Sequence, residues 1–247
     1  MKIKRKNISI ITVCFNNYLG LKKTFDSIVD SISDDVEYVI IDGGSTDETI
    51  DYLNNIFHHN QDKTIIWVSE PDNGIYDAMN KGISMASGTW LIFMNAGDTF
   101  YAHDTLEKII PSLDKKKAIV YGDMFYNGKI VPAENISILK SGVIMACHQS
   151  MFFNKELIGQ DLKYNLSYPI YADYELVVKI TEKNKYTTTH IKIPVSIYEG
   201  GGVSDKISKQ KRYDKYKIVY KYYGFLGVYN SLFYWIKNKI KRKIKMR

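Results

Sequence analysis

The sequence has few of the residues that mark disulfide-stapled or membrane-spanning proteins. Only two of its 247 residues are cysteine. Cys14 and Cys147 belong to no Cys-x-x-Cys or Cys/His cluster, so we expect two small buried thiols in a reducing compartment and no disulfide framework. No run approaches the ~20 apolar residues of a transmembrane helix, and the longest, 225–236, reaches about half that length.

Signatures of other nucleotide-binding and secreted proteins are also missing. No G-x-G-x-x-G follows the first apolar run and no G-x-x-x-x-G-K-[ST] occurs, which argues against dinucleotide dehydrogenases and P-loop enzymes. The apolar run at 8–13 follows a basic N-terminus, but it is too short for a signal-peptide core and lacks a small-residue cleavage site. The sequence therefore predicts a cytoplasmic protein, either soluble or peripheral on a membrane.

Positive charge is in excess, and it gathers at one end. The net charge is +7, yet residues 206–247 hold fourteen lysines and arginines against one acid, Asp214, and the rest of the chain is mildly acidic. Tyrosines recur at helical spacing from Tyr213 to Tyr223, and the apolar stretch 225–236 follows. This pattern is typical of an interfacial helix on an anionic membrane surface, although a helix packed on the domain with a solvated lysine face fits it too. No nucleic-acid motif accompanies the charge, so we expect no nucleic-acid partner.

The first hundred residues alternate predicted strands and helices. Apolar, β-branched runs are typical of buried parallel strands, and amphipathic stretches between them are typical of helices. A capping box of Ser45 and Glu48 predicts that the second helix begins at Ser45. The predicted strands are 8–14, 36–41, 64–68 and 90–94, and the predicted helices are 18–32, the one from Ser45, and 76–86. This order favours an α/β fold with a mostly parallel central sheet flanked by helices.

The second half is less regular. A two-residue hairpin is predicted at Asn127 and Gly128, between strands at 119–126 and 129–131. Further elements are a strand at 146–153, a helix at 172–182, short strands at 186–193 and 195–198, and a flexible loop at 200–202. We divide the chain into a nucleotide-binding half (1–98), an acceptor-binding half (99–205) and a basic aromatic helical tail (206–247).

Polar residues follow each of the four predicted parallel strands. In open α/β sheets, ligands bind beyond the carboxyl ends of the strands, so these four segments should form one rim. The segments contain Asn16 after the first strand, Asp42 after the second, Asp72 after the third, and Asn95 and Asp98 after the fourth. Asp42 suits a contact to a nucleotide base or ribose, whereas Ser45 and Asp47 also suit a helix N-terminus.

Asp98 is the residue that most suggests a metal. It ends an apolar strand that should be central, where a lone carboxylate is costly without a partner. A divalent cation bridging a diphosphate is a natural partner, and carboxylate oxygen is a ligand for Mn²⁺ or Mg²⁺. The alternative is an ordinary Ala-Gly-Asp turn.

Taken together, four blocks resemble the signatures of family 2 glycosyltransferases. These blocks are residues 8–17, 39–49, 70–82 with the sequence EPDNGIYDAMNKG, and 90–98 with NAGD at its end. The resemblance is strong over the first hundred residues and looser over 119–205, and it is greatest to bacterial enzymes of colanic acid, O-antigen and capsular polysaccharide synthesis. It implies a GT-A fold, a nucleoside-diphosphate sugar donor, a divalent metal and inversion at the anomeric carbon.

The same resemblance assigns the donor site residue by residue. Thr12 and Asn16 match first-strand nucleotide contacts, Asp42 matches the carboxylate that binds the base, and Asp98 matches the metal-binding end of the family's acidic motif. Asp72, Asp77, Asn80 and Asn95 match further polar positions facing the donor. Relatives often carry Asp-x-Asp-Asp where this chain has Asn95 to Asp98, so only one carboxylate is left and metal dependence is less certain.

The resemblance also implies a catalytic base. Asp173 in Asp-Tyr-Glu-Leu matches the base of the family's Glu-Asp-x-x-Leu motif, although a helix cap is the alternative. Glu175 is a second choice, and because it points about 200° around the helix from Asp173, only one of the two should face the site. His148, Gln149 and Asp123 are expected to contact the diphosphate or the acceptor, against a purely structural role for each.

The sequence therefore predicts an inverting glycosyltransferase that adds a sugar to a glycan acceptor, polyprenyl-linked as in the look-alikes, at the inner face of the cell membrane. The alternatives are a non-catalytic nucleotide-sugar-binding protein and a membrane-surface adaptor defined by its tail.

Overall fold

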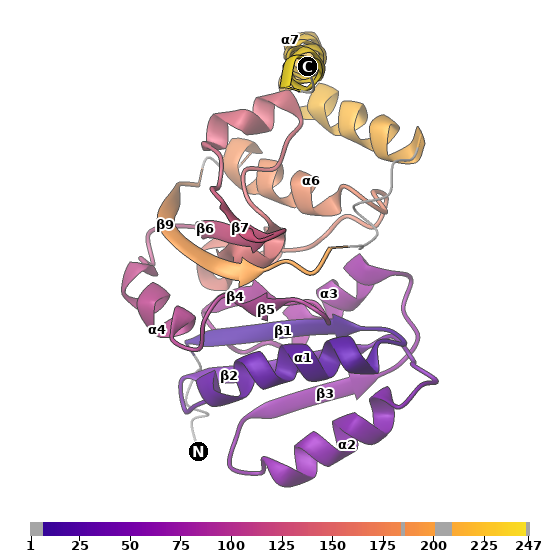
Figure 1. Cartoon of the computed structure of the whole chain (residues 1–247), viewed down its shortest axis with the longest axis vertical. Helices are drawn as coiled ribbons and strands as arrows, with labels where there is room; N and C mark the ends of the chain where they lie inside the picture. The colour runs from indigo at the N-terminus through magenta and orange to yellow at the C-terminus, as the bar shows by residue number, and fades with distance from the viewer. Residues whose placement is uncertain (1–6, 184–185, 201–208, 246–247) are drawn as a thin grey trace.

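The computed structural model describes residues 7–183, 186–200 and 209–245. Within these ranges, nine strands form one curled sheet in the order β3-β2-β1-β4-β8-β6-β9-β5, with β7 paired to β6 (Figure 1). The strands are β1 (Ile8–Cys14), β2 (Val36–Asp42), β3 (Ile65–Ser69), β4 (Trp90–Phe93), β5 (Thr99–Phe100), β6 (Ile119–Tyr126), β7 (Lys129–Val131), β8 (Met151–Asn154) and β9 (Thr188–Ile197). Residues 201–202 of the predicted loop, and 206–208 and 246–247 of the predicted tail, lie outside the described ranges.

Helices cover both faces of this sheet. They are α1 (Tyr18–Ile28), α2 (Thr49–His59), α3 (Ile75–Met85), α4 (Thr105–Ile109), α5 (Lys155–Ile158), α6 (Ala172–Val178) and α7 (Lys209–Lys245). Short 3₁₀ turns lie at η1 (Val29–Ser31), η2 (Ile110–Ser112), η3 (Ile136–Ser141), η4 (His148–Ser150) and η5 (Gly159–Asp161), and a π-helical turn, η6 (Lys179–Lys183), extends α6. The predicted α/β fold, with a central sheet flanked by helices, is confirmed, but the sheet is mixed and not mostly parallel, because β5, β7 and β8 pair antiparallel with their neighbours.

The parallel part of the sheet creates the crevice where the site lies. β1 pairs in parallel with β2 and β4, and β2 with β3, so the strand order reverses between β1 and β4. β8 then joins β4 antiparallel and links the first half of the chain to the second. A crevice at such a reversal, beyond the carboxyl ends of the strands, is where open α/β sheets bind ligands.

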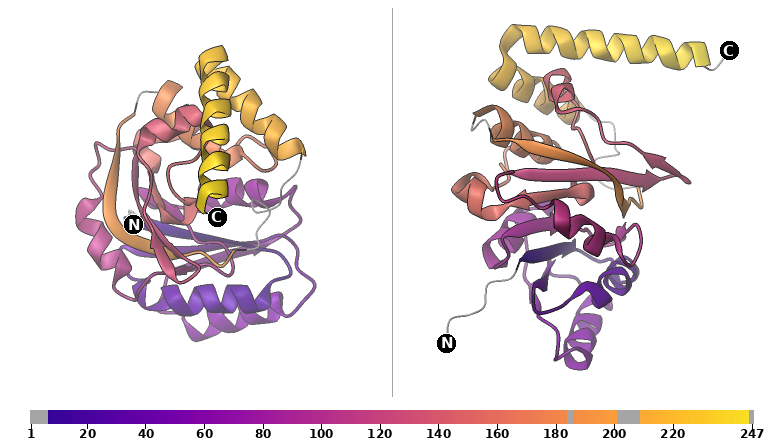
Figure 2. Two further views of the ribbon diagram at one scale, coloured as in Figure 1. Left: turned by 45° about the horizontal axis from the view of Figure 1, so that its top comes forward. Right: turned by 90° about the vertical axis from the view of Figure 1, so that its left-hand side faces the viewer.

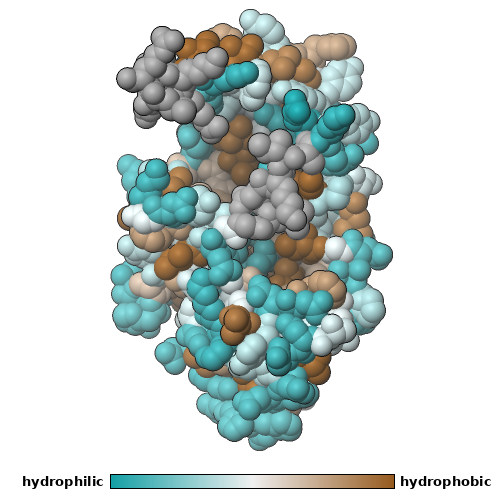
Figure 3. Space-filling view, turned by 45° about the vertical axis from the view of Figure 1, so that its right-hand side comes forward, coloured by the Kyte–Doolittle hydropathy of each residue, from teal (hydrophilic) through white to brown (hydrophobic). Residues whose placement is uncertain are grey.

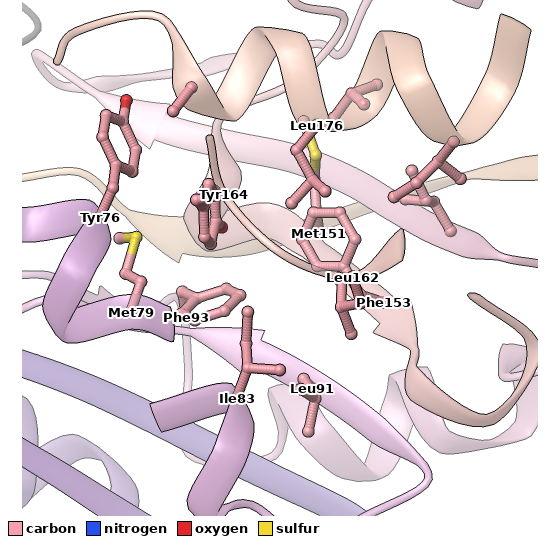
Figure 4. Close-up of a cluster of buried hydrophobic side chains, with 14 of the residues drawn as sticks. Tyr76, Met79, Ile83, Leu91, Phe93, Met151, Phe153, Leu162, Tyr164 and Leu176 are labelled. Atoms are coloured by element: carbon pink, nitrogen blue, oxygen red, sulfur yellow. The ribbon is translucent and has the colours of Figure 1, made fainter. Parts of the chain in front are cut away.

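Two hydrophobic clusters hold the layers together, one on each face. Ile8 and Ile10 of β1 pack with α1 and α2, while Ile11 and Val13 pack with α3 and α6. Every residue of β1 is buried, which is the near-continuous apolar pattern that a strand covered on both faces requires. In Figure 4, Tyr76, Met79 and Ile83 of α3 lie beside Phe93 and Leu91 of β4, close to Tyr164 and Leu176. The helices that carry site residues therefore rest on a packed core.

Several local predictions need correction. The second helix begins at Thr49 and not at Ser45, because the Ser45 hydroxyl donates a hydrogen bond to Asp42 instead of capping the helix. The predicted strand at 146–153 is shorter, since residues 148–150 form a 3₁₀ turn. The two short strands predicted between 186 and 198 are the single strand β9. The hairpin at Asn127 and Gly128 is confirmed, with both residues at positive φ.

The tail is one helical element with a sharp break. α7 changes direction at Gly224, whose φ of 62° and ψ of −159° are non-helical. Before the break, Ile218 and Val219 are fully buried against the domain. This part of the tail is therefore a helix packed on the domain, which was the alternative to a membrane-surface helix. After the break, the helix crosses the end of the molecule remote from α2 (Figures 1 and 2). No helix in the described ranges is long and apolar enough to cross a membrane.

Candidate functional site

A cavity of about 420 Å³ opens at the reversal of strand order. Its walls come from both halves of the chain: the ends of β1 and β4, the start of α3, the turn η4, the start of α6 and the end of β9. The polar residues that line it are Asn17, Asn95, Asp98, His148, Gln149, Asp173 and Glu199, with Phe15, Tyr76 and Tyr198 among its aromatic walls. Three of these side chains are carboxylates, so the cavity can hold a cation or take up a proton.

Asp98 lies in the turn that ends β4. Gly97 adopts a φ of 107°, which an L side chain rarely tolerates, and its missing Cβ leaves room for the Glu199 carboxylate. Asp98 Oδ2 accepts a hydrogen bond from Gln149 Nε2, and Oδ1 accepts one from the backbone N–H of Glu199 at 2.9 Å. Burial raises the pKa of Asp98 to about 6 in spite of these hydrogen bonds. A cation beside Asp98 would favour its ionised form.

Asp173 lies in the first turn of α6 and lines the same cavity. Its Oδ1 accepts a hydrogen bond from the backbone N–H of Tyr174 at 2.7 Å. Burial raises its pKa to about 6, while the hydrogen bond from the Tyr174 backbone, the adjacent Tyr76 side chain and the charge of Lys211 act in the other direction. A carboxylate with a raised pKa that is still ionised at neutral pH suits a general base.

His148 and Asn95 join the two walls. Asn95 Nδ2 donates a hydrogen bond to His148 Nε2 at 2.9 Å. Burial lowers the pKa of His148 to about 4, so its ring is uncharged at neutral pH. His148 can therefore position a substrate by hydrogen bonding, but it cannot offer a positive charge to a diphosphate.

A second cavity of about 370 Å³ adjoins the first. The two share Asp173, His148, Gln149 and Tyr198, which therefore form the wall between them. The rest of the second cavity is largely apolar and is lined by Met124, Val131, Pro132, Ala133, Ile144, Met145 and Ala146, with Glu134 as the charged residue beside them. Asp173 is thus accessible from two adjacent spaces, as a base between two substrates needs to be.

The rims of β2 and β3 meet at Gly43. A Cβ there would lie 2.6 Å from Asp72 Oδ2, so glycine permits this contact. Asp42 is fully buried and accepts hydrogen bonds from the Gly44 and Ser45 backbone N–H groups and from the hydroxyls of Ser45 and Ser69. Asp72 is the more accessible of the two carboxylates. A base contact by Asp42 stays a prediction, and it requires the loop at residues 43–45 to open.

Other predicted donor residues make internal contacts. Thr12 is fully buried and donates to the Met94 carbonyl at 2.7 Å, which ties β1 to the end of β4. Asn16, at a φ of 47°, accepts a hydrogen bond from Thr46 N at 2.8 Å. It is exposed near the rim without lining the first cavity. Donor contacts by these two residues also stay predictions.

Asp77 and Asn80 are not brought to either cavity described above. Asn80 exchanges two hydrogen bonds with the backbone of Tyr164, and Asp77 accepts from the backbone and side-chain nitrogens of Asn73. Both residues line a separate pocket. The helical turn they occupy points their side chains away from the site, so this geometry does not favour donor contacts.

Asp123 and Glu175 line neither of these two cavities and are held by hydrogen bonds within the protein. Asp123 Oδ1 accepts from Ala133 N at 2.9 Å and pairs with His190 Nε2 at 2.8 Å, joining β6 to β9. Glu175 is buried on the far face of α6, where it accepts from Lys221 Nζ at 2.9 Å and the Tyr222 hydroxyl at 2.7 Å. As expected from their spacing, Asp173 and not Glu175 faces the site.

The cavity fits a divalent cation that is shared with a substrate. In the described part of the chain, no cluster of three or more histidine, cysteine or acidic side chains could hold a metal alone. However, Asp98 and Glu199 both line the cavity, and Asn95 Oδ1 has no hydrogen-bond partner among the described residues. Mg²⁺ is commonly bound by one or two carboxylates together with substrate phosphates, and this sparse oxygen set suits that arrangement.

Glu199 and Tyr76 were missed by the sequence reasoning. Glu199 follows β9 and reaches Asp98 only because β9 lies beside β5 and β6. Tyr76 is in the block that resembles the family, but its hydroxyl extends from α3 to the segment before α6 and donates to the Ile170 carbonyl at 2.8 Å. The polar pair Tyr198-Glu199 before a glycine run was the available signal for the first residue, whereas nothing local identified the second.

Comparison with known proteins places these features in context. A family model described as glycosyl transferase family 2 matches residues 9–166. A protein named PGL/p-HBAD biosynthesis glycosyltransferase, from Mycobacterium bovis BCG, is 35% identical over 208 residues, covering 81% of this chain and 79% of the relative. An uncharacterized glycosyltransferase from Mycobacterium tuberculosis is 32% identical over 181 residues, covering 70% of this chain and 68% of the relative.

Solved structures share the fold at low sequence identity. The mannosyltransferase PcManGT from Pyrobaculum calidifontis, in complex with GDP-Man and Mn²⁺, is 18% identical with a TM-score of 0.64, over 79% of this chain and 57% of that one. S. aureus TarS 1–349 in complex with UDP-GlcNAc is 15% identical with a TM-score of 0.67, over 86% and 65%. This chain therefore spans less than two thirds of either neighbour.

Proposed function

Because the chain belongs to glycosyl transferase family 2 and is a glycosyltransferase, we propose that it inverts the anomeric carbon of a nucleoside-diphosphate sugar as it transfers that sugar to a glycan hydroxyl. The observation that carries this proposal is the presence of Asp98 and Asp173 in one cavity, contributed by the two halves of the chain. Non-catalytic binding would need the first carboxylate but has no use for the second.

In this proposal the donor occupies the first cavity. Its diphosphate lies near Asp98, and its nucleoside extends toward the rim of β1, β2 and β3, where Asn16, Asp42 and Asp72 are the polar residues. Phe15 is 61% exposed beside Gly43, so its ring is available to stack on a base. Two neighbours of similar fold were solved with GDP-Man and UDP-GlcNAc, which supports a nucleotide sugar without naming the base.

Asp98 would hold the cation, with Glu199 and Asn95 beside it. When bound, Mn²⁺ or Mg²⁺ supplies positive charge that stabilises the leaving diphosphate. Gln149 fixes the orientation of the Asp98 carboxylate by donating to Oδ2. His148 is neutral, so we assign it a positioning role toward the diphosphate or the acceptor, together with Gln149.

The acceptor would occupy the second cavity and present its hydroxyl to Asp173. The Asp173 carboxylate takes the hydroxyl proton as the acceptor oxygen bonds to the anomeric carbon and the bond from that carbon to the diphosphate oxygen breaks. Attack from the side opposite the leaving group inverts the configuration. The hydrogen bond from Tyr174 N and the packing of Tyr76 keep the carboxylate in place.

We infer further that the acceptor is lipid-linked and that the enzyme works peripherally at the inner face of the cell membrane. The apolar lining of the second cavity suits an acceptor with hydrocarbon near the reacting hydroxyl. Incubation with UDP-, GDP- and dTDP-sugars, Mn²⁺ and short-chain polyprenyl-linked glycans, followed by NMR of the product, tests the proposal. We expect transfer from one nucleotide class with inverted configuration. A retained configuration would refute the single-displacement mechanism, and no donor binding by any nucleotide would refute the donor site.

A further inference from the structure

The half of α7 that follows Gly224 carries a long apolar face that no described part of the chain covers. Eight of its large apolar residues are between 43% and 80% exposed, and all of them except Trp235 share one face of the helix. The seven on this face are Phe225, Leu226, Tyr229, Leu232, Phe233, Ile236 and Ile240. In Figure 3 hydrophobic atoms lie along the top of the molecule, where Figure 1 places α7. We refer to these seven residues as the α7 stripe.

The stripe is a single face of one helix. At about 100° per residue, its members fall within an arc of about 120° around the helix axis. The opposite side is turned toward the domain. Gly227 and Ser231 are buried there, and a Cβ on Gly142, which follows η3, would lie 3.1 Å from Ser231 Oγ. The helix therefore rests on the domain by its back and presents the stripe outward.

The first half of α7 anchors this arrangement. Lys221 and Tyr222 bond to the buried Glu175, and Tyr223 donates to Glu182 at 3.2 Å. These contacts end directly before the break at Gly224. The tail is thus divided by function: residues 209–223 attach the helix to the domain, and residues 225–240 display the stripe.

Charge identifies the partner of the stripe. Lys237 and Lys239 lie at the two edges of the stripe, and Lys239 Nζ is 4.9 Å from the centroid of the Trp235 ring. The sequence continues to residue 247 with five further lysines and arginines, and no acidic residue follows Asp214. The core of a protein interface is depleted in lysine, whereas lysines beside an apolar helical face extend to lipid phosphates. Aromatic rings in the stripe suit the interfacial region of a bilayer.

We propose that the α7 stripe docks on an anionic lipid bilayer, with the helix axis parallel to the membrane plane. The lysines at its edges contact headgroup phosphates while the stripe enters the acyl boundary. This refines the expectation for residues 206–247, because only the part after Gly224 contacts lipid. The docking does not depend on the transfer reaction, so it can be tested independently of it.

The experiment is sedimentation of the full chain with two kinds of vesicle, phosphatidylcholine alone and an equal mixture with phosphatidylglycerol. We expect the mixed vesicles to retain the protein and the triple variant L232Q/F233Q/I236Q to lose more than about tenfold in affinity. A matched control is F57Q/I110Q/I130Q, which changes three residues that are 46–47% exposed elsewhere on the surface and should bind like the wild type. K237Q/K239Q should weaken binding to the mixed vesicles by about fivefold for each lysine.

Circular dichroism melting of each variant checks that the fold is intact. Unchanged binding by the triple variant would overturn the proposal. So would a wild-type protein that ignores both vesicles and is a dimer by light scattering, if the triple variant is a monomer, because the stripe would then be an interface between two copies.

Discussion

Asp98 and Asp173 line one cavity from opposite halves of the chain, and burial raises the pKa of each to about 6. Asp98 shares its oxygens between Gln149 and the backbone of Glu199, whereas Asp173 has one backbone donor and the Tyr76 ring beside it. The first environment keeps a carboxylate oriented for a cation. The second leaves a carboxylate with oxygen free to receive a proton. This difference supports separate roles for the two residues.

Replacement of Asp173 by Asn removes the proposed base but keeps the size of the side chain. We expect kcat to fall by roughly 10²–10⁴-fold, the usual contribution of general base catalysis, with little change in donor affinity. Transfer of labelled sugar and calorimetric titration with the nucleotide measure the two quantities. D62N, at an exposed surface position, is the control. Undiminished turnover in D173N would falsify the assignment of the base.

Replacement of Asp98 by Ala should separate nucleotide binding from the metal. Mn²⁺ should raise the nucleotide affinity of the wild type, and we expect this gain to be at least about tenfold smaller in D98A. Loss of an outer-shell partner of a metal already costs roughly tenfold in metal affinity, and loss of a direct ligand should cost no less. Titration with Mn²⁺ and with EDTA measures this gain. E199Q is the companion variant, and its effect should be smaller because the Glu199 side chain is 48% exposed and already pairs with Lys23, whereas Asp98 is buried. Equal Mn²⁺ dependence in D98A and the wild type would remove Asp98 from the metal site.

Local sequence patterns predicted the polar residues that follow the parallel strands, but not the residues that the second half of the chain and α3 bring to the site. The apolar runs of β1 to β4 and the polar residues after them are short-range signals, and the positions of Asp98 and Asp173 follow from them and from the resemblance. The separation of Asp173 from Glu175 around α6 follows from helix geometry alone. Glu199 and Tyr76 reach the site through β9 and α3, and such contacts depend on tertiary packing that no local pattern encodes.

Local sequence patterns also do not show which polar residues are buried by contacts within the protein. Asp42 and Thr12 are polar residues at strand ends, which a linear pattern assigns to a ligand. In the folded chain, Ser45 and Ser69 bond to Asp42, and Met94 and Tyr38 bond to Thr12. Buried polar groups are usually satisfied within the protein, so a polar residue at a strand end is ambiguous until its neighbours are known.

Activity and stability should respond in opposite directions to acid. In the proposed mechanism transfer needs ionised Asp173, so kcat should fall as the pH is lowered through about 6. Stability behaves otherwise, because a carboxyl group whose folded pKa is raised binds more protons in the folded state, and its charge destabilises the fold as the pH rises from about 4 through 6. At pH 7 the melting temperature of D173N should therefore be higher than that of the wild type, by the equivalent of up to about 3 kcal/mol in unfolding free energy. Near pH 4 the two proteins should have the same melting temperature. Calorimetric melting across this range measures the difference, and a constant difference would contradict the raised pKa.

Loss of the Glu175 contacts should damage stability without damaging the chemistry. The Glu175 side chain is 2% exposed and Lys221 is 49% exposed. Because Lys221 is partly solvated, Lys221→Met should cost only about 1 kcal/mol of unfolding free energy. Glu175→Ala should cost more, about 2–4 kcal/mol, since it opens a cavity and leaves the Tyr222 hydroxyl without its carboxylate. Urea unfolding measures both, and E175Q, which keeps the volume, should fall between them. Turnover per folded molecule should stay within about twofold of the wild type, because Glu175 faces α7 and not the cavity. If E175Q instead lost transfer at unchanged stability, Glu175 and not Asp173 would be the base.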